Sequence, residues 1–186
     1  VERLIDINPE RLITGHGEPF VGADNIRIQR TKVRDAVQYI RDATFAGMNE
    51  GKDLWTLMRE VQLPPHLEIG QGHGKVAWIV RAIWEEHLGW FRFESSTELY
   101  ATPVQAVMPD FVEMAGGVGP VLARARAYWE ASDPLKALHM AEAVLTTDAA
   151  NRDALTIQRD ATQMLLDQSG RTNFSEVRWL EAELAQ

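Results

Sequence analysis

Apolar residues recur at intervals of three or four positions along almost all of the chain after residue 24. The spacing is clear in Ile26, Val33, Val37 and Ile40, in a helix expected to weaken near Gly47, and it returns in the stretch VAWIVRAIW that follows Lys75. This period places apolar side chains on one face of an α-helix, whereas a half-buried strand would alternate at every second residue. The sequence therefore predicts a mainly α-helical protein over residues 24–186.

Helix boundaries are marked by residues that satisfy free backbone groups. Asp53, Asp133, Asn151 and Asn173 each precede a periodic apolar run, and side chains of this kind accept hydrogen bonds from the first free N–H groups of a helix. Gly89 follows the run VAWIVRAIWEEHL, at the position where glycine commonly closes a helix. We expect helices that begin after the four capping residues and one that ends at Gly89.

The part of the chain after Gly119 differs from the rest in its small apolar residues. The spacing predicts three short helices over residues 120–131, 134–145 and 152–168, followed by a last helix after Asn173. This order is typical of a tetratricopeptide-like helical hairpin with an added helix, repeated too few times to make a solenoid. Small side chains would let these helices approach closely; they are Ala125, Ala137, Ala141, Ala154 and Ala161.

Two stretches lack this clear periodicity. Residues 1–7 end in Asn8-Pro9, which predicts the last turns of a helix, and residues 11–14 read as a short strand that leads to His16 between two glycines. Later in the chain, RFESSTELYATP predicts an extended segment, and PVQAVMPDFVEMAGG predicts a helix that is kinked at Pro109 and closed by two glycines.

Composition excludes several classes of partner and chemistry. The net charge of −8 argues against nucleic acid as a partner, and the absence of cysteine removes disulfides, thiol nucleophiles and cysteine-ligated metal sites. No apolar run approaches the ~18 residues that a membrane span needs, so we expect a soluble protein and leave the compartment open between cytoplasm and periplasm. The first residue is not methionine, from which we expect a fragment, a processed form or a trimmed chain.

The histidines do not assemble a metal site by spacing alone. The five of them include no His-x-His and no His-Glu-x-x-His pattern. GQGHGK, residues 70–75, lacks the spacing of a phosphate-binding loop and fits a tight turn into the next helix. His16 and His73 are the two for which a functional role is worth testing. The glycines on both sides of His16 leave its imidazole uncrowded, which suits a metal ligand and suits an ordinary strand-to-helix turn equally well.

Several stretches together resemble one enzyme superfamily. ERLIDINPERLITGHGEPFVGADNI resembles the closing segment of a metallo-β-lactamase-fold (αββα) hydrolase, in which a final strand carries a Gly-His-Gly. LMREVQLP, VRAIWEEHLGWF and FVEMAGGVGPVLARARAYWEASDPLKALHMAEAVLTTDAANRDAL resemble, in this order, the dimerisation domain of alkyl sulfatases. The resemblance covers almost the whole chain.

The resemblance implies that the chain contains parts of two domains with different roles. Residues 1–23 would be the end of the catalytic domain, and residues 24–186 a helical dimerisation domain that pairs two subunits and helps to close the active site. His16 would be the last ligand of a binuclear zinc site whose other ligands lie outside this sequence. The chain would then be inactive in isolation and would act with a separate or cleaved catalytic domain on sulfuric or related esters.

One departure bears on the substrate. Where alkyl sulfatases tend to carry Gly-Thr-Val-Ser-His-Asn, residues 74–79 read GKVAWI, so polar groups that could face a sulfate are replaced by apolar ones. His73 or Arg81 could take over the contact with an anionic ester, since a cationic donor suits it. Arg81 could equally pair with Glu85 one turn further on.

The sequence therefore leaves two hypotheses about function. In the first, the chain is the dimerisation and active-site-closing part of a zinc hydrolase, and it forms a homodimer through an apolar surface around Trp78 to Phe91 and the long helix. In the second, it is a stand-alone helical module that binds another protein and catalyses nothing.

Overall fold

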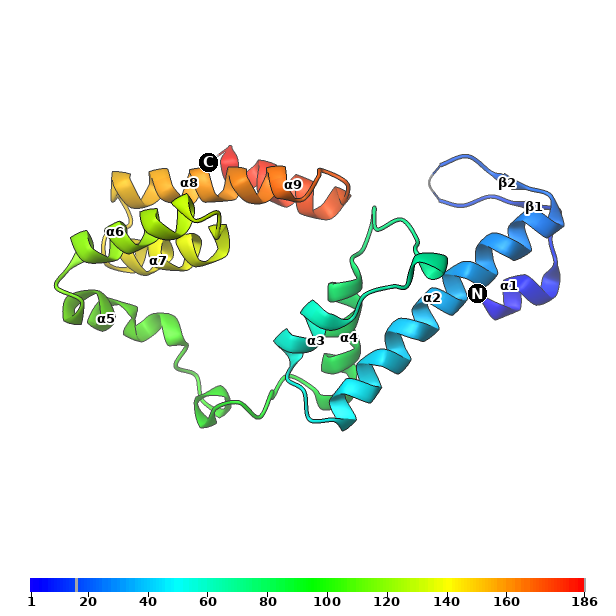
Figure 1. Ribbon diagram of the computed structural model, residues 1–186, viewed down its shortest axis with the longest axis horizontal. Helices are drawn as coiled ribbons and strands as arrows, with labels where there is room; N and C mark the ends of the chain where they lie inside the picture. The colour runs from blue at the N-terminus through cyan, green and yellow to red at the C-terminus, as the bar shows by residue number, and fades with distance from the viewer. Residues whose placement is uncertain (16, 186) are drawn as a thin grey trace. The chain divides into compact units, whose positions relative to one another are not determined.

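The protein is described here by a computed structural model covering residues 1–15 and 17–185. The chain forms two compact units, Val1–Arg92 and Phe93–Gln186 (Figure 1). The described residues are mainly helical, as the sequence predicts, with one two-stranded hairpin near the N-terminus. No helix among them is long and apolar enough to cross a membrane.

The first unit contains the long helix and the hairpin. Its elements are α1 (Glu2–Ile7), β1 (Arg11–Leu12), β2 (Phe20–Val21), α2 (Ala23–Asn49), α3 (Leu54–Glu60), the 3-10 helix η1 (Pro65–Leu67) and α4 (Val76–Leu88).

The second unit begins with two short turns and continues as a succession of helices. Its elements are the 3-10 helices η2 (Ser96–Leu99) and η3 (Val104–Val107), then α5 (Met108–Met114), α6 (Val118–Glu130), α7 (Pro134–Thr147), α8 (Arg152–Gln168) and α9 (Phe174–Leu184).

The N-terminal strand is shorter than the sequence suggests and has its own partner. The predicted strand over residues 11–14 is limited to Arg11–Leu12, which pairs antiparallel with Phe20–Val21. The guanidinium of Arg30 on α2 lies over the ring of Phe20, 4.6 Å from its centroid. The hairpin is therefore held against α2. Its two strands pair with each other, without a strand from another sheet.

Helix α2 continues past Gly47, where the sequence predicts that it weakens. Gly47 lies inside the helix, and a Cβ at this position would collide with Leu57 Cδ2 of α3. The glycine costs helix stability, but it lets α2 and α3 approach closely. The core of this unit gathers there, with contributions from α2, α3 and α4: Ile40, Leu54, Leu57, Val61, Val76, Val80 and Trp84.

Helix α4 ends at Gly89, as predicted. Its two tryptophans differ in their exposure to solvent. Trp84 is 6% exposed and belongs to the core, whereas Trp78 is 40% exposed. Lys75 places its ammonium 5.9 Å from the centroid of the Trp78 ring. A single helix cannot bury residues six positions apart against one neighbour, since they differ by about 120° in direction.

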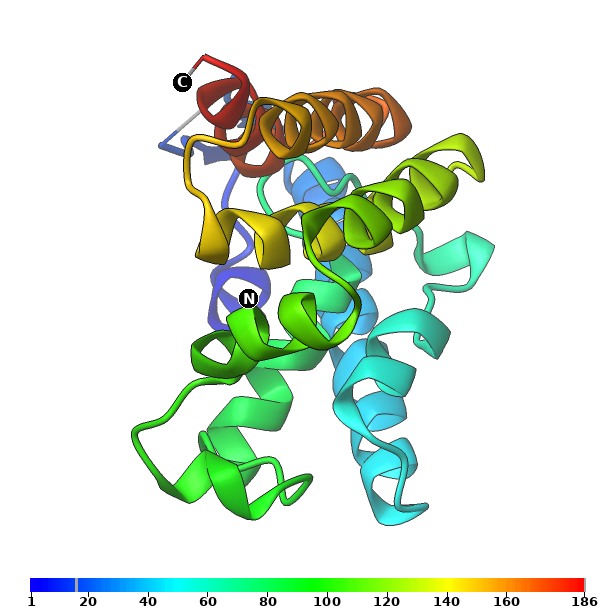
Figure 2. The same cartoon turned by 90° about the vertical axis from the view of Figure 1, so that its left-hand side faces the viewer.

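The second unit is a layered stack of helices. α6 packs on α7, α7 on α8, and α8 on α9, while α5 contacts α7; Figure 2 shows this succession from the side. The five alanines predicted to let the helices approach closely are fully buried: Ala125, Ala137, Ala141, Ala154 and Ala161. Because their side chains are single methyl groups, the helix axes can come close without leaving voids.

Two predictions for residues 92–117 are wrong in detail. The stretch predicted as extended contains η2, whose start is capped by Ser95, with its side chain accepting from the Thr97 N–H at 3.2 Å. Pro109 does not kink a helix, because it stands in the first turn of α5, where a proline needs no backbone hydrogen bond. The predicted helix is thus η3 followed by α5.

The predicted helix caps are present. Asp53 accepts from the Thr56 N–H at 3.0 Å and from the Thr56 hydroxyl at 2.6 Å, and these bonds hold the pKa of the Asp53 carboxyl below its usual value. Asn151 and Asn173 accept from the N–H three residues on, at 3.0 Å in both cases. In the same way, Asp133 caps α7.

Candidate functional site

The glycine-rich segment, residues 70–74, forms the rim of a small cavity in the first unit. The cavity has a volume of about 270 Å³, and apolar side chains make up half of its lining residues. His73, proposed from the sequence as a substrate contact, is exposed on this rim. The apolar lining is contributed by Ile40, Leu63, Ile69, Val76 and Ile79.

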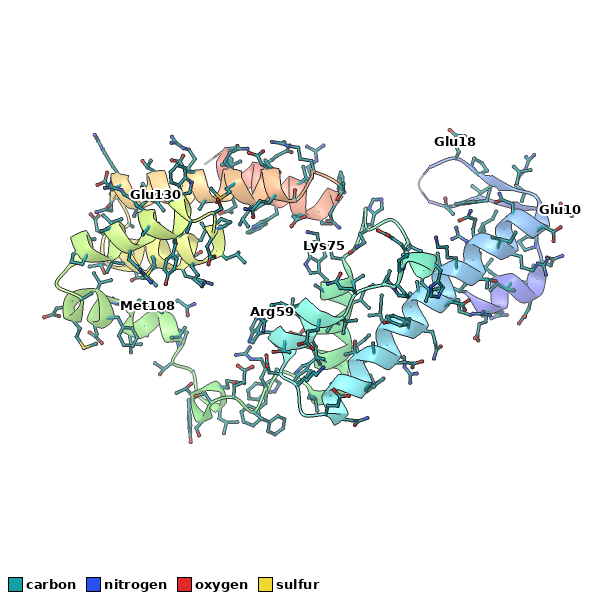
Figure 3. The ribbon with its side chains drawn as sticks, viewed as in Figure 1. Glu10, Glu18, Arg59, Lys75, Met108 and Glu130 are labelled. Carbon is teal, nitrogen blue, oxygen red and sulfur yellow. The ribbon has the colours of Figure 1, made fainter. Side chains whose placement is uncertain are left out.

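The segment is tied to the start of α4 by Gln71. The Val76 N–H donates to Gln71 Oε1 at 2.9 Å, so a side chain five residues earlier satisfies the first free donor of the helix. Lys75, labelled in Figure 3, stands between the segment and the helix. Sequence reasoning did not single out Gln71; the signal was a polar side chain before a helix that has no Ser, Thr, Asp or Asn at its N-cap.

Arg81 lies further along α4 and does not line the cavity. Its Nε donates to Glu85 Oε1 at 2.8 Å, and both side chains are about half exposed. The i, i+4 pair considered from the sequence is therefore confirmed. The structure does not bring His73 and Arg81 into one cavity, and a role of either in binding substrate stays a prediction.

His16, predicted as a zinc ligand, lies outside the described residues. Within residues 1–15 and 17–185, no group of three or more His, Asp or Glu side chains is placed to hold a metal ion. A binuclear zinc site needs several such ligands, so the described residues do not fit a complete zinc site by themselves.

The end of α4 exposes apolar surface, as the dimer hypothesis requires. Trp90 is 70% exposed, and its ring lies beside that of Phe91 with the centroids 5.8 Å apart. Leu88, the last residue of α4, is also exposed. Large apolar side chains grouped on a surface are typical of protein contacts, so this end of α4 is one candidate interface.

Comparison with known proteins finds a family match over most of the chain. Residues 55–181 match the family described as alkyl sulfatase dimerisation. This match covers more than half of the chain and includes α4 together with the helices through most of α9.

Individual relatives agree with the family match. A linear primary-alkylsulfatase of a Pseudomonas species is 29% identical over 127 residues, which make up 66% of this chain and 24% of that protein. An (R)-specific secondary-alkylsulfatase of Pseudomonas is 28% identical over 159 residues, or 83% of this chain and 24% of the relative. An alkyl/aryl-sulfatase of Saccharomyces cerevisiae is 26% identical over 158 residues, with the same coverage of 83% and 24%. The chain thus spans about a quarter of the length of these relatives.

A solved structure extends the likeness to the whole fold. The structure of a stereoselective inverting secondary alkylsulfatase from Pseudomonas matches 98% of this chain with a TM-score of 0.85 and 25% sequence identity. The chain covers 29% of that protein. The mainly α-helical architecture expected from the sequence is therefore found in a corresponding part of a known alkylsulfatase.

Proposed function

The chain belongs to the alkyl sulfatase dimerisation family, and from this membership we propose that it pairs two copies of a larger hydrolase acting on sulfuric or related esters. The observation that carries the proposal is the family match over residues 55–181. The relatives are named as alkylsulfatases, and the chain corresponds to only about a quarter of each. Ester hydrolysis would therefore be the work of the whole protein, with this chain as its pairing part.

The exposed end of α4 supports the same proposal. Trp90 leaves most of its surface in contact with water, although tryptophan is among the residues that contribute most when buried in an interface. In a two-fold dimer the same surface patch is used by both copies, so one exposed apolar patch on each chain is sufficient.

The direct test is the molar mass of the chain in solution. Sedimentation equilibrium over a wide range of protein concentration should give twice the 21.0 kDa of one chain. A molar mass that stays at the monomer value up to high concentration would contradict the proposal and favour a stand-alone module that binds another protein.

We further propose that the pairing part helps to close the active site, with His73 and Arg81 directed at the anionic ester. The support is the cationic or hydrogen-bonding chemistry of His73, just before α4, and of Arg81, within α4, together with the resemblance of this stretch to alkyl sulfatases. In the complete hydrolase, His73→Ala and Arg81→Ala should raise KM for alkyl sulfates at least tenfold, while Lys32→Ala on α2 serves as a control. Unchanged KM in both variants would remove these residues from the site.

His16 is proposed as one zinc ligand of that hydrolase, on the strength of its Gly-His-Gly context. Replacing His16 by Ala in the complete protein should lower the bound zinc measured by atomic emission. Equal zinc content in His16→Ala and the unchanged protein would refute this assignment.

A further inference from the structure

Helices α8 and α9 border a small cavity in the second unit. It has a volume of about 380 Å³, within the range of roughly 300–1,000 Å³ that small-molecule sites occupy. The two helices pack against each other, and the cavity lies where the first half of α8 meets the end of α9. We call it the α8–α9 cavity. Its lining includes Leu155, Gln158, Arg159 and Thr162 of α8, with Glu183 and Leu184 of α9.

Thr162 is a buried polar side chain of this lining, with 6% of its surface exposed. Elsewhere in the chain, the hydroxyls of Thr44 and Thr156 each donate to the carbonyl four residues earlier, at 2.7 and 2.8 Å, as is common for threonine inside a helix. The Thr162 hydroxyl makes no hydrogen bond with any residue that the structure describes. A buried hydroxyl without a partner costs free energy, so a group held in the cavity is needed to satisfy it.

Gln158 lies one turn before Thr162, on the same face of α8. Its side chain is half-buried, and its amide also makes no hydrogen bond within residues 1–15 and 17–185. A carboxamide and a hydroxyl can each donate and accept hydrogen bonds. The two side chains therefore offer both kinds of hydrogen bond to one group in the cavity.

The charges of the lining do not favour an anion. Arg159 donates from Nε and Nη2 to Asp160 Oδ1, at 2.9 and 2.7 Å, so its positive charge already has a partner. Glu183 adds a carboxylate to the lining. Leu155, which is 43% exposed, and the half-buried Leu184 add apolar surface. A ligand that suits this lining is neutral, donates and accepts hydrogen bonds, and carries an apolar group.

We propose that the α8–α9 cavity binds a neutral secondary amide with an aliphatic group, which is the chemistry of a short peptide segment. A secondary amide has one N–H donor and one C=O acceptor, and these pair with the carboxamide of Gln158 and the hydroxyl of Thr162. The aliphatic group packs against Leu155 and Leu184. The site is separate from the ester contact proposed for residues of the first unit.

The binding of N-acetyl-leucine N-methylamide tests the proposal directly. Backbone amide chemical shifts of the unchanged chain should move saturably with the probe, with one-to-one stoichiometry, and mainly in α8 and α9. N-acetyl-leucine carries a carboxylate in place of the second amide and should bind roughly fivefold or more weakly, because it loses a donor and brings a negative charge. No saturable shift with the probe, as for a cavity that holds water alone, would overturn the proposal. Equal affinity for the two compounds would overturn it as well.

Two variants locate the site. Thr162→Val keeps the shape of the side chain and should raise the dissociation constant of the probe roughly fivefold or more. It should leave the melting temperature unchanged or higher, because the hydroxyl has no partner to lose. Gln158→Met should raise the dissociation constant by a similar factor. Unchanged dissociation constants in both variants would overturn the proposal.

Thr146→Val on α7 is the matched control. It also removes a threonine hydroxyl, but one that lies outside the cavity and donates to the Ala143 carbonyl at 2.6 Å. The affinity for the probe should stay unchanged, whereas the melting temperature should fall because a hydrogen bond is lost. A loss of affinity equal to that of Thr162→Val would show that the effect does not arise in the α8–α9 cavity.

Discussion

The two units of the chain are held together in different ways. In the first unit the core consists of large side chains such as Ile40, Leu57 and Trp84, which fill the space between three helices. In the second unit alanines make up six of the eleven residues of the core cluster, Ala141 among them, and valine, leucine and isoleucine make up the rest. A position filled by a large side chain is sensitive to lost volume, whereas a position where a buried methyl group lies between two helices is sensitive to added volume. The same chain thus offers both tests.

The largest effect is expected from Trp84→Ala in the first unit. Removing a buried Trp side chain costs roughly 3–5 kcal/mol because the cavity it leaves is only partly filled. The indole N–H of Trp84 is buried without a hydrogen-bond partner. Trp84→Phe removes this donor and most of the ring stays, so its cost should be clearly smaller. Chemical denaturation gives both values.

Hydrogen exchange read by mass spectrometry locates the effect. Faster exchange in α2, α3 and α4, with α6 to α8 unchanged, would support two separately held cores. Equal acceleration in both units after Trp84→Ala would contradict the comparison.

The second-largest effect is expected from Ala141→Leu in the second unit. Ala141 is fully buried on α7, and three extra carbon atoms there force helices apart at a cost of about 1–3 kcal/mol. Ala127→Leu, at an exposed position of α6, is the matched control and should change the stability by less than about 0.5 kcal/mol. Similar unfolding free energies for both variants would show that the alanines are not close-packed.

The same substitution should cost more stability in the first unit than in the second. Gly→Ala inside a helix stabilises by up to about 1 kcal/mol where the new methyl group has space. A Cβ added to Gly119 in α6 would meet no atom within 4 Å beyond its chain neighbours and its own helical turn. Residue 120 is a proline, however, and its ring disfavours helical backbone for a non-glycine residue before it, so Gly119→Ala should change the stability little. Gly47→Ala should destabilise, since its methyl group would meet Leu57. The melting temperatures of the two variants measure these changes in stability. A stabilising Gly47→Ala would mean that α2 and α3 can move apart freely.

The smallest effect is expected from acid. The bonded carboxyl of Asp53 in the first unit and that of Asp133, bonded to Lys136, in the second have pKa values lowered below 3.8. A lowered pKa in the folded state means that the stabilisation is complete above pH 3.8 and is lost as pH falls through the folded value. Asp53→Asn and Asp133→Asn should each reduce the fall of the melting temperature in acid. If the melting temperature of either variant falls in acid as much as that of the unchanged protein, the carboxylate at that cap does not contribute to the pH dependence of stability.

The candidate site was only partly predictable from the sequence. The pair between Arg81 and Glu85 follows from their spacing on one helix, and the structure contains it. The cavity beside His73 does not follow from any spacing, because Ile40 reaches it from α2 and Leu63 from the turn before η1. The division of residues 104–114 into η3 and α5 does not follow either, because the sequence pattern there favours one kinked helix.

What the sequence by itself determined are the features that depend on neighbours within about one helical turn. The helices, their caps at Asp53, Asn151 and Asn173, and the end of α4 at Gly89 are of this kind. Periodicity and capping are interactions between residues three or four positions apart, so no distant partner is required.

The tertiary structure alone decided which of several equivalent features are buried. It buried Trp84 and exposed Trp78, kept α2 helical through Gly47, and divided the chain between residues 92 and 93. Each of these outcomes depends on a helix that is far away in the sequence, and local spacing carries no information about where that helix lies.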